Sequence, residues 1–322
     1  MGLLVEGRWV DKWYDTKTSN GRFIRSDSQF RSEVTRDGSS GFPAEAGRYH
    51  LYVSLACPWA HRVLIYRKLK GLEAAISVTA VAPHMWENGW VFGGYEGADE
   101  DPLFHAQYMH QIYTKAQSDY SGRVTVPVLW DKQTNTIVSN ESSEIIRFLN
   151  TEFDEIGVPG LDFYPEELRE EIDEINERVY HNVNNGVYKC GFATTQEAYE
   201  EAFDALFGTL DWLEQRLETR RWLCGERVTE ADWRLLPTLL RFDPVYFGHF
   251  KCNHRRIADY PELSDYTRAL YQTPGIADTF NLDHVKTHYY GSHKTVNPSL
   301  IVPKGPALEW NKPTRRPSAL AP

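Results

Sequence analysis

Residues 48–71 read RYHLYVSLACPWAHRVLIYRKLKG, and this stretch decides the fold. Its first part, RYHLYVSLA, has the branched and aromatic composition of a β-strand. The residues after Cys57 carry apolar side chains at helical spacing, and Gly71 is typical of a helix end. Pro58 suits the first helical position, because the N–H group that proline lacks would have no partner there. We therefore expect a strand that leads directly into a helix, with Cys57 at the junction.

The residues that follow continue this alternation of strands and helices. ISVTAVA (76–82) predicts a second strand, and a Gly- and Trp-bearing loop is expected over 83–101. A short helix near 105–116 is followed by two short strands in VTVPVLWD (124–131) and TIVS (136–139), and then by a helix in ESSEIIRFLNTEF (141–153). This order is that of a thioredoxin-like domain.

The rest of the chain has a different composition. Gly and Pro gather near 155–165, and the pattern beyond them is helical, with helices expected at 195–220 and 230–242. Thr229 and Asp232 form a capping-box pattern at the start of the second of these. We predict an α/β thioredoxin-like domain followed by an all-α domain. The predicted segments are an irregular N-terminal arm (1–45), the α/β domain (46–154), a linker (155–165), the helical domain (166–295) and an extended, proline-rich tail (296–322).

Composition excludes several classes of function. The 322 residues carry a net charge of -10, which argues against a nucleic-acid partner, because binding phosphates requires a basic surface. The sequence contains no apolar run long enough to cross a membrane, and it does not begin like a secretion signal. Four cysteines are too few for a disulfide framework in a chain of this length, so we expect a reducing compartment, the cytoplasm.

Cys57 is the candidate nucleophile. At the start of a helix, free N–H groups and the helix dipole favour a thiolate and lower the pKa of a cysteine from about 8.5. A dithiol oxidoreductase would have a second cysteine at position 60, where this chain has Ala60. A mixed disulfide at Cys57 must then be resolved by an external thiol, for which glutathione is the abundant candidate. The alternative is a buried, inert cysteine, as we expect for Cys190, Cys224 and Cys252.

The segment CPWAHR (57–62) resembles the glutathionyl-hydroquinone reductases, the Xi class of glutathione transferases. The likeness covers nearly the whole chain in order, through GWVFGGYEG (89–97), GRVTVPVLWDKQTNTIVSNESSEIIRFLN (122–150), NNGVYKCGF (184–192), RFDPVYFGHFKCN (241–253) and HYYGSH (288–293). The resemblance implies a homodimer that removes glutathione from a glutathionyl-hydroquinone, with glutathione as co-substrate; we expect no metal, from the ligand spacing given below. It also implies a cis Pro127, and a glutathione site of Trp86, Arg123, Val126, Glu141 and Ser142. The hydroquinone would be held by Tyr188, Tyr246 and Tyr289.

Each of these roles has a simpler structural alternative. Asn140 and the acidic residues after it could be plain helix capping, and Arg123 could be a solvated loop residue. Trp86, expected in a loop, could fill a domain interface, and each tyrosine could be a core residue, with Tyr290 in place of Tyr289. His249, Cys252 and His254 do not have the spacing of paired zinc ligands.

Two other functions stay open at this point. A broader thiol transferase, with dehydroascorbate reductase or deglutathionylase activity, would use Cys57 without the tyrosines. A noncatalytic module with the glutathione transferase fold would not need Cys57.

Overall fold

The computed structural model of the chain describes residues 2–317, 319 and 320, and it divides into two units. The first unit consists of residues 2–13, Ser26–Leu161 and Thr279–His288. The second consists of Tyr14–Arg25, Asp162–Asp278 and the described residues from Tyr289 onward. The N-terminal arm therefore contributes to both units. The segment boundaries drawn from the sequence remain a prediction.

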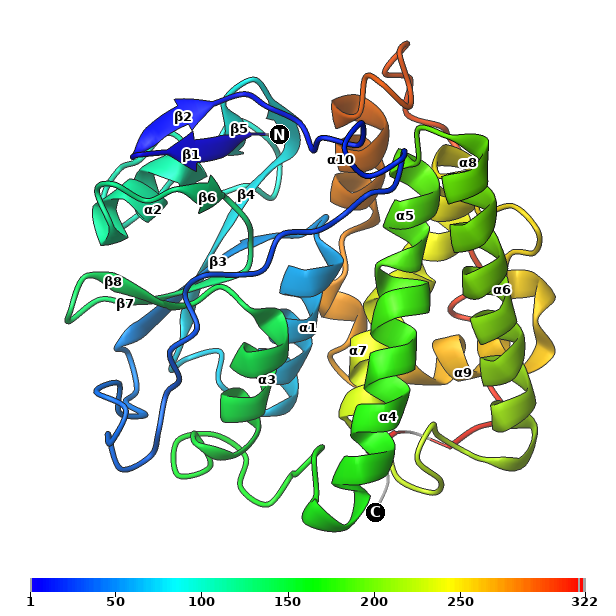
Figure 1. Cartoon of the computed structure of the whole chain (residues 1–322). Coiled ribbons are helices and arrows are strands. Elements are labelled where there is room, and N and C mark those ends of the chain that lie inside the picture. Colours follow the sequence, from blue (N-terminus) through cyan, green and yellow to red (C-terminus); the bar gives the residue numbers. More distant parts are fainter. Residues whose placement is uncertain (1, 318, 321–322) are drawn as a thin grey trace. The chain divides into compact units, whose positions relative to one another are not determined.

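A five-stranded sheet forms the centre of the first unit (Figure 1). In spatial order its strands are β5 (Gly89–Phe92), β4 (Ser77–Trp86), β3 (Tyr49–Ser54), β7 (Val128–Asp131) and β8 (Thr136–Ser139). Strand β3 pairs parallel with β4 and antiparallel with β7. Every residue of β3 is buried, as expected for a central strand covered on both faces.

Three helices accompany this sheet: α1 (Pro58–Leu69), α2 (Met109–Ala116) and α3 (Ser142–Thr151). Helices α1 and α3 pack against each other, whereas α2 contacts β5 and β8. One hydrophobic cluster joins Tyr52 of β3, Ile112 of α2 and Trp130 of β7, all fully buried. The predicted order of strands and helices is confirmed, and β3 leads into α1 with Cys57 between them.

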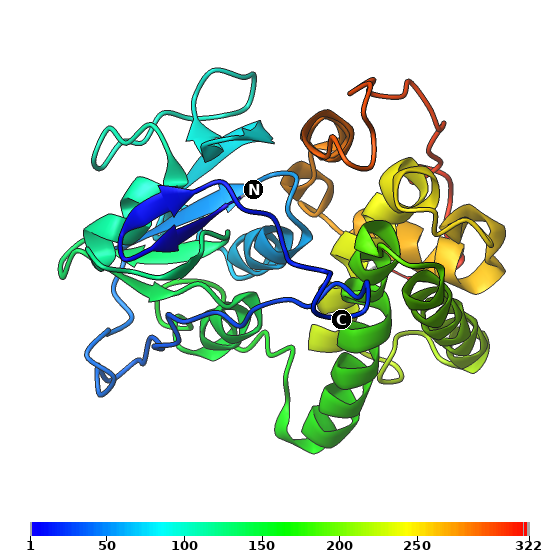
Figure 2. The same cartoon turned by 45° about the horizontal axis from the view of Figure 1, so that its top comes forward.

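Two segments differ from the prediction. The arm was expected to be irregular, but β1 (Leu3–Val5) and β2 (Arg8–Val10) form a hairpin, and β1 also pairs with β6 (Gly122–Arg123) (Figure 2). The loop expected over 83–101 was wrong in its first part, because β4 continues to Trp86 and β5 returns beside it. Strands of two to four residues are too short to show a period, and partners distant in sequence stabilise them.

The second unit is helical. Its elements are η1 (Glu166–Leu168), α4 (Arg169–Val179), η2 (Tyr180–Asn184), α5 (Gly186–Phe192), α6 (Gln196–Thr219), α7 (Glu230–Arg241), η3 (Phe242–Tyr246), α8 (Phe247–His249), η4 (Ile257–Asp259) and α9 (Pro261–Tyr271). The short η5 (Ala277–Thr279) and α10 (Leu282–Ser292) complete the chain's elements and contribute residues to both units. Helix α6 packs against α5 and α9, and α7 against α4 and α9.

Capping residues explain where the two longest predicted helices begin. Thr195 caps α6 by accepting a hydrogen bond from the N–H of Ala198. The capping box predicted for α7 is confirmed, since the Thr229 N–H donates to Asp232 Oδ2 at 2.7 Å. Asp232 is fully buried and also accepts from the hydroxyl of Tyr266 at 2.8 Å. The capping box thus also fixes α9 against the start of α7.

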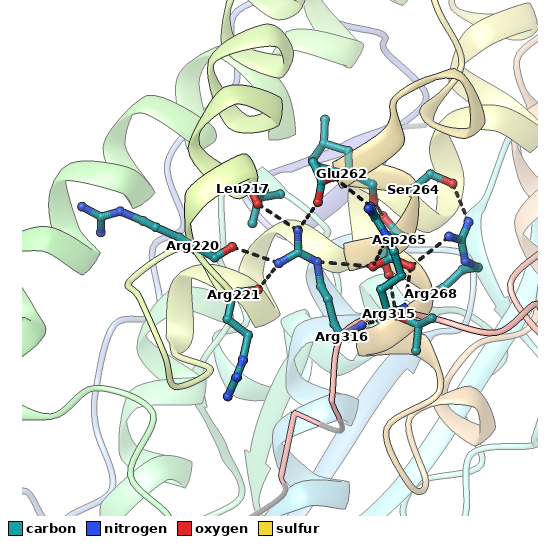
Figure 3. Close-up of polar contacts among 12 residues, drawn as sticks. Leu217, Arg220, Arg221, Glu262, Ser264, Asp265, Arg268, Arg315 and Arg316 are labelled. Carbon is teal, nitrogen blue, oxygen red and sulfur yellow. Dashed lines mark hydrogen bonds and ion pairs between the residues drawn. The ribbon is translucent and has the colours of Figure 1, made fainter.

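The described part of the C-terminal tail contains no helix or strand, and two arginines attach it to the helical unit (Figure 3). Arg316 donates to the carbonyl oxygens of Leu217 and Arg220 at the end of α6, and to Glu262 of α9 at 2.7 Å. Its side chain is 8% exposed, whereas that of Arg315, which also reaches Glu262, is 68% exposed. Arg316 therefore closes the carboxyl end of α6, whose last carbonyls have no partner within the helix.

Candidate active site

Cys57 occupies the N-cap position of α1, with an extended backbone, and Pro58 is the first helical residue. The carbonyl oxygen of Cys57 accepts the first helical hydrogen bond, from the N–H of His61 at 3.0 Å. The sulfur is half-buried and donates to the carbonyl oxygen of Val126 at 3.4 Å. The amino end of a twelve-residue helix therefore lies next to this sulfur, as the sequence predicted.

The peptide bond between Val126 and Pro127 is cis, as expected from the resemblance. The Val126 carbonyl faces the Cys57 sulfur. Among residues 2–317, 319 and 320, no hydrogen-bond partner is found for the Val126 N–H group. The Val126 carbonyl oxygen thus lies beside the thiol, and the backbone of this residue can pair with an extended peptide.

His61 and Arg62 follow Cys57 on α1, and both have partners other than the sulfur. His61 Nε2 lies 2.8 Å from the hydroxyl of Thr279, and its ring packs on Phe280. The guanidinium of Arg62 lies over the ring of Trp59 at 4.6 Å. His61 therefore ties α1 to the segment before α10, and Arg62 is a buried positive charge near the start of α1.

Glu141 is the N-cap of α3, so the sequence reading that gave this role to Asn140 was wrong. Its Oε1 accepts from the N–H of Ser143 at 3.0 Å, and its Oε2 accepts from the hydroxyl of Ser28 at 3.1 Å. Burial raises the pKa of Glu141, but the hydrogen bonds from Ser143 and the charge of Arg62 outweigh burial, so the net pKa is lowered. Glu141 is therefore an ionised, half-buried carboxylate, and the buried Ser142 begins α3 beside it.

The other two predicted glutathione residues lie in strands. Trp86 is the last residue of β4, so its expected place in a loop was wrong; its side chain is 50% exposed and its ring packs on His84 at 4.8 Å. Arg123 lies in β6, and its Nη1 donates to the carbonyl oxygen of Lys12 at 2.6 Å. Both side chains therefore sit on paired strands of the first unit.

The three predicted substrate tyrosines meet in the second unit. The hydroxyl of Tyr289 lies 2.5 Å from that of Tyr188 and 3.0 Å from that of Tyr246. Burial raises the pKa of Tyr246 and of Tyr289 well above the ordinary value, so both remain protonated phenols at neutral pH. The hydroxyl of Tyr290 instead bonds the carbonyl oxygen of Pro244 at 3.2 Å. Tyr289, and not its neighbour, thus completes a cluster of three phenols.

Two π-helical turns lie next to these phenols, and no pattern in the sequence predicts them. The η2 turn ends at Asn184, just before Tyr188 on α5, and the η3 turn ends at Tyr246 itself. Pro244, within η3, lacks the N–H that a regular helix uses. Such turns shift side chains from their regular helical positions and are frequent at functional sites.

Sequence reasoning also missed residues of the N-terminal arm. The guanidinium of Arg25 lies over the ring of Tyr188 at 5.3 Å, and its Nε donates to Asn185. Ser28 binds Glu141, as described above. Single polar residues in an arm without a repeating pattern give no signal in one sequence, so only the folded chain reveals these contacts.

The remaining cysteines lie in the second unit and are buried. Burial raises the pKa of Cys224 to about 12 and that of Cys252 well above its ordinary value. Both are therefore protonated at neutral pH, as expected for cysteines that only pack.

Among the described residues, no cluster of three or more His, Cys, Asp or Glu is placed to hold a metal ion. Every helix among the described residues is too short or too polar to span a bilayer.

Comparisons with known proteins identify both domains of the chain. Residues 56–152 match the family model of the glutathione S-transferase N-terminal domain, and residues 196–269 match that of the C-terminal domain. The chain is 59% identical over 307 residues to glutathionyl-hydroquinone reductase PcpF of Sphingobium chlorophenolicum, covering 95% of this chain and 97% of that protein. It is 55% identical over 323 residues to glutathionyl-hydroquinone reductase YqjG of Escherichia coli, covering 98% of each.

Solved structures give the same result. The glutathione-bound structure of Escherichia coli YqjG superposes with a TM-score of 0.91 at 52% identity, covering 98% of this chain and 99% of that one. A Xi-class glutathione transferase from Natrialba magadii superposes with a TM-score of 0.92 at 47% identity, covering 98% and 96%. The fold predicted from the sequence, a thioredoxin-like domain followed by a helical one, is therefore confirmed.

Proposed function

Since the chain belongs to the glutathionyl-hydroquinone reductases, the Xi class of glutathione transferases, we propose that it reduces glutathionyl-hydroquinones to hydroquinones with glutathione as reductant. The observation that carries this proposal is Cys57 at the N-cap of α1, beside the Val126 backbone. Position 60 holds Ala60, and all other cysteines of the chain belong to the second unit. This single nucleophile needs a thiol from solution to complete its turnover.

In the first step the Cys57 thiolate attacks the sulfur of the glutathionyl adduct. A disulfide forms between Cys57 and glutathione, and the bond between that sulfur and the ring carbon breaks. The electron pair of the broken bond goes to the ring carbon, which takes a proton, so the hydroquinone leaves reduced. We propose that Tyr188, Tyr246 and Tyr289 bind the hydroquinone hydroxyls. Neutral phenols can stabilise the charge that develops on the leaving ring.

In the second step a glutathione thiolate attacks the mixed disulfide at its glutathione sulfur. Oxidised glutathione leaves, and the Cys57 thiolate is restored. Two electrons have passed from two glutathione sulfurs to the ring carbon, and the protein returns to its starting state. This step requires Cys57 to be a good leaving group. The start of α1 favours this, because a helix N-terminus stabilises the thiolate.

We propose that the glutathione site recognises the ammonium and carboxylate charges of the tripeptide. The ionised Glu141 suits the ammonium of the γ-glutamyl group, while Ser142 and the positive end of the α3 dipole suit its carboxylate. The Val126 backbone suits the cysteinyl peptide groups. Arg123 is proposed to hold the other carboxylate, and the exposed Trp86 to cover the tripeptide.

Mass spectrometry of the reduced protein, mixed briefly with a glutathionyl-hydroquinone, tests the mechanism. We expect one glutathione adduct, mapped to Cys57, that disappears on adding glutathione as oxidised glutathione forms. Cys57→Ser should give no adduct. An adduct on another cysteine, or hydroquinone release without any adduct, contradicts the proposed mechanism.

A homodimer and a cytoplasmic location belong to the proposal as well, on the basis of the resemblance and of the few, buried cysteines. Light scattering of the purified chain tests the dimer, which requires twice the mass of the 322-residue chain.

A further inference from the structure

We propose that the N-terminal arm is a structural part of the glutathione site, in which Trp9 and Ser28 act as positioning residues for Trp86 and Glu141. This inference rests on the proposed function, because it concerns the residues proposed there to hold glutathione. The arm lies outside residues 56–152, the span matched by the N-terminal family model. All the contacts that carry it lie within the first unit.

Trp9 fixes the hairpin that carries Trp86. Its indole N–H donates to the carbonyl oxygen of Glu87, the residue after Trp86, at 2.7 Å. Its ring covers Gly89, which pairs with Trp86 across the hairpin, so closely that an added Cβ would lie 2.8 Å from a ring carbon. The ring also stacks on that of His110 of α2, at a centroid distance of 4.8 Å. Trp9 thus links the hairpin turn to α2.

The arm also holds Arg123. Strand β1 pairs Leu3 with Arg123, and the Arg123 guanidinium donates to the Lys12 carbonyl oxygen at 2.6 Å and to that of Gly2 at 3.4 Å. The orientation of the Arg123 side chain is therefore set by one carbonyl just before β1 and one just after β2. The same hairpin carries Trp9, so one element positions two of the proposed glutathione contacts.

A later part of the arm runs beside the start of α3. The N–H of Asn140 donates to the carbonyl oxygen of Phe30 at 3.1 Å, and the N–H of Phe30 returns a bond to Asn140 Oδ1 at 3.2 Å. Two residues earlier in the arm, Ser28 Oγ lies 3.1 Å from Glu141 Oε2 and 3.2 Å from the Asn140 carbonyl oxygen. Ser28 therefore orients the carboxylate that the N-cap already binds through Oε1.

These contacts have a common consequence. Trp86, Arg123 and Glu141 come from β4, β6 and the start of α3, which are separate elements. A tripeptide bound by all three requires a fixed spacing between them. The arm is bonded to Glu87 next to Trp86, to Arg123 and to Glu141. Loss of an arm contact should therefore lower glutathione affinity while leaving the nucleophile at Cys57 intact.

The test compares Trp9→Ala, Trp9→Phe and Ser28→Ala by calorimetric titration with glutathione, with unfolding temperature measured alongside. We expect a dissociation constant about tenfold higher for Trp9→Ala, corresponding to about 1.4 kcal/mol. Trp9→Phe, which keeps a ring but loses the N–H, should recover part of this loss. Ser28→Ala should weaken binding by about threefold or more. Steady-state kinetics should show a higher KM for glutathione, while alkylation of Cys57 by iodoacetamide keeps its rate.

Matched controls come from the arm itself. Val10→Ala alters the neighbouring, 39% exposed side chain of β2, and Ser32→Ala alters an exposed serine of the same arm. Both should bind glutathione like the wild type. The inference is wrong if Trp9→Ala and Ser28→Ala also bind like the wild type, or if they slow Cys57 alkylation with KM unchanged. Failure of the wild-type protein to bind glutathione would instead contradict the proposed function.

Discussion

The sulfur of Cys57 lies 3.4 Å from the carbonyl oxygen of Val126. The proposed nucleophile and the backbone proposed to pair with glutathione are thus neighbours, although they lie 69 positions apart in the chain. A tripeptide that pairs with Val126 would have its own sulfur brought toward Cys57. The proposed mechanism thus couples binding and chemistry at this one contact.

Cys57→Ser should reduce turnover of a glutathionyl-hydroquinone by about 1,000-fold or more, because a serine hydroxyl is a far weaker nucleophile at neutral pH. Cys190→Ala, which removes a buried thiol of the second unit, should retain turnover. Stopped assays of hydroquinone release measure both. A noncatalytic module predicts no difference between the wild type and Cys57→Ser, so equal rates would support that alternative.

Glu141→Gln should weaken glutathione binding about 10- to 100-fold, since it removes the charge proposed to pair with the γ-glutamyl ammonium. Glu144→Gln, on the same helix but bonded to Arg31, is the matched control and should change binding by less than about twofold. Calorimetric titration with glutathione measures both. Equal weakening by the two variants would contradict the role given to Glu141.

The lowered pKa of Glu141 also predicts a pH dependence of stability. A carboxylate whose pKa is lower in the folded than in the unfolded state stabilises the fold above its unfolded pKa, ordinarily 4.5, and loses that effect as pH falls through the folded value. The wild type should therefore unfold at higher urea concentration than Glu141→Gln at about pH 7. The difference should shrink below about pH 4.5. A difference that grows on acidification would show that the sign of the pKa shift is wrong.

Tyr289→Phe should lower kcat/KM for a glutathionyl-hydroquinone about 10- to 100-fold, because Tyr289 bonds both other phenols of the cluster. Tyr290→Phe is the control, as its hydroxyl bonds the backbone carbonyl of Pro244 and no phenol of the cluster among the described residues. The same variants should be assayed with dehydroascorbate and with a glutathionylated peptide. No loss on the hydroquinone adduct would favour the broader thiol transferase, which does not need the tyrosines. Equal loss on all substrates would contradict a role of Tyr289 that is specific to the hydroquinone.

Arg316→Ala should lower the free energy of unfolding by about 2–4 kcal/mol, because it leaves carbonyl groups of α6 and the carboxylate of Glu262 without a buried donor. Arg315→Ala, which removes a side chain that is 68% exposed, should change it by less than about 1 kcal/mol. Urea unfolding of the full chain measures the two. Similar small effects from both would show that the tail does not hold α6.

Local rules were sufficient for much of this fold. Pro58 marked the start of α1, and the pair Thr229 and Asp232 marked that of α7, because caps satisfy backbone groups within a few residues. The β1–β2 hairpin was not predictable, since its partner β6 is far along the chain and its strands have three residues each. Short strands are stabilised by tertiary pairing and have no repeating pattern of their own.

The candidate site also has a part that local sequence features predict and a part that depends on tertiary structure. Cys57 followed from the strand, the proline and the missing second thiol, all of which are local features. The meeting of Tyr188, Tyr246 and Tyr289 came from a family resemblance, because no period in the sequence distinguishes them among 18 tyrosines. Glu141 caps α3, and its carboxylate accepts a hydrogen bond from Ser28. This pairing depends on the path of the arm, which only tertiary structure determines.

The two units are interleaved along the chain, and this affects their synthesis. The first unit draws on residues 2–13, Ser26–Leu161 and Thr279–His288, with Thr279 bonded to His61 of α1. A ribosome releases these segments in order, at about 5–20 residues per second. The thioredoxin-like unit therefore lacks its last segment until most of the helical unit has been translated. A gene truncated after residue 161 would encode an incomplete domain, so the halves cannot be exchanged between proteins as simple modules.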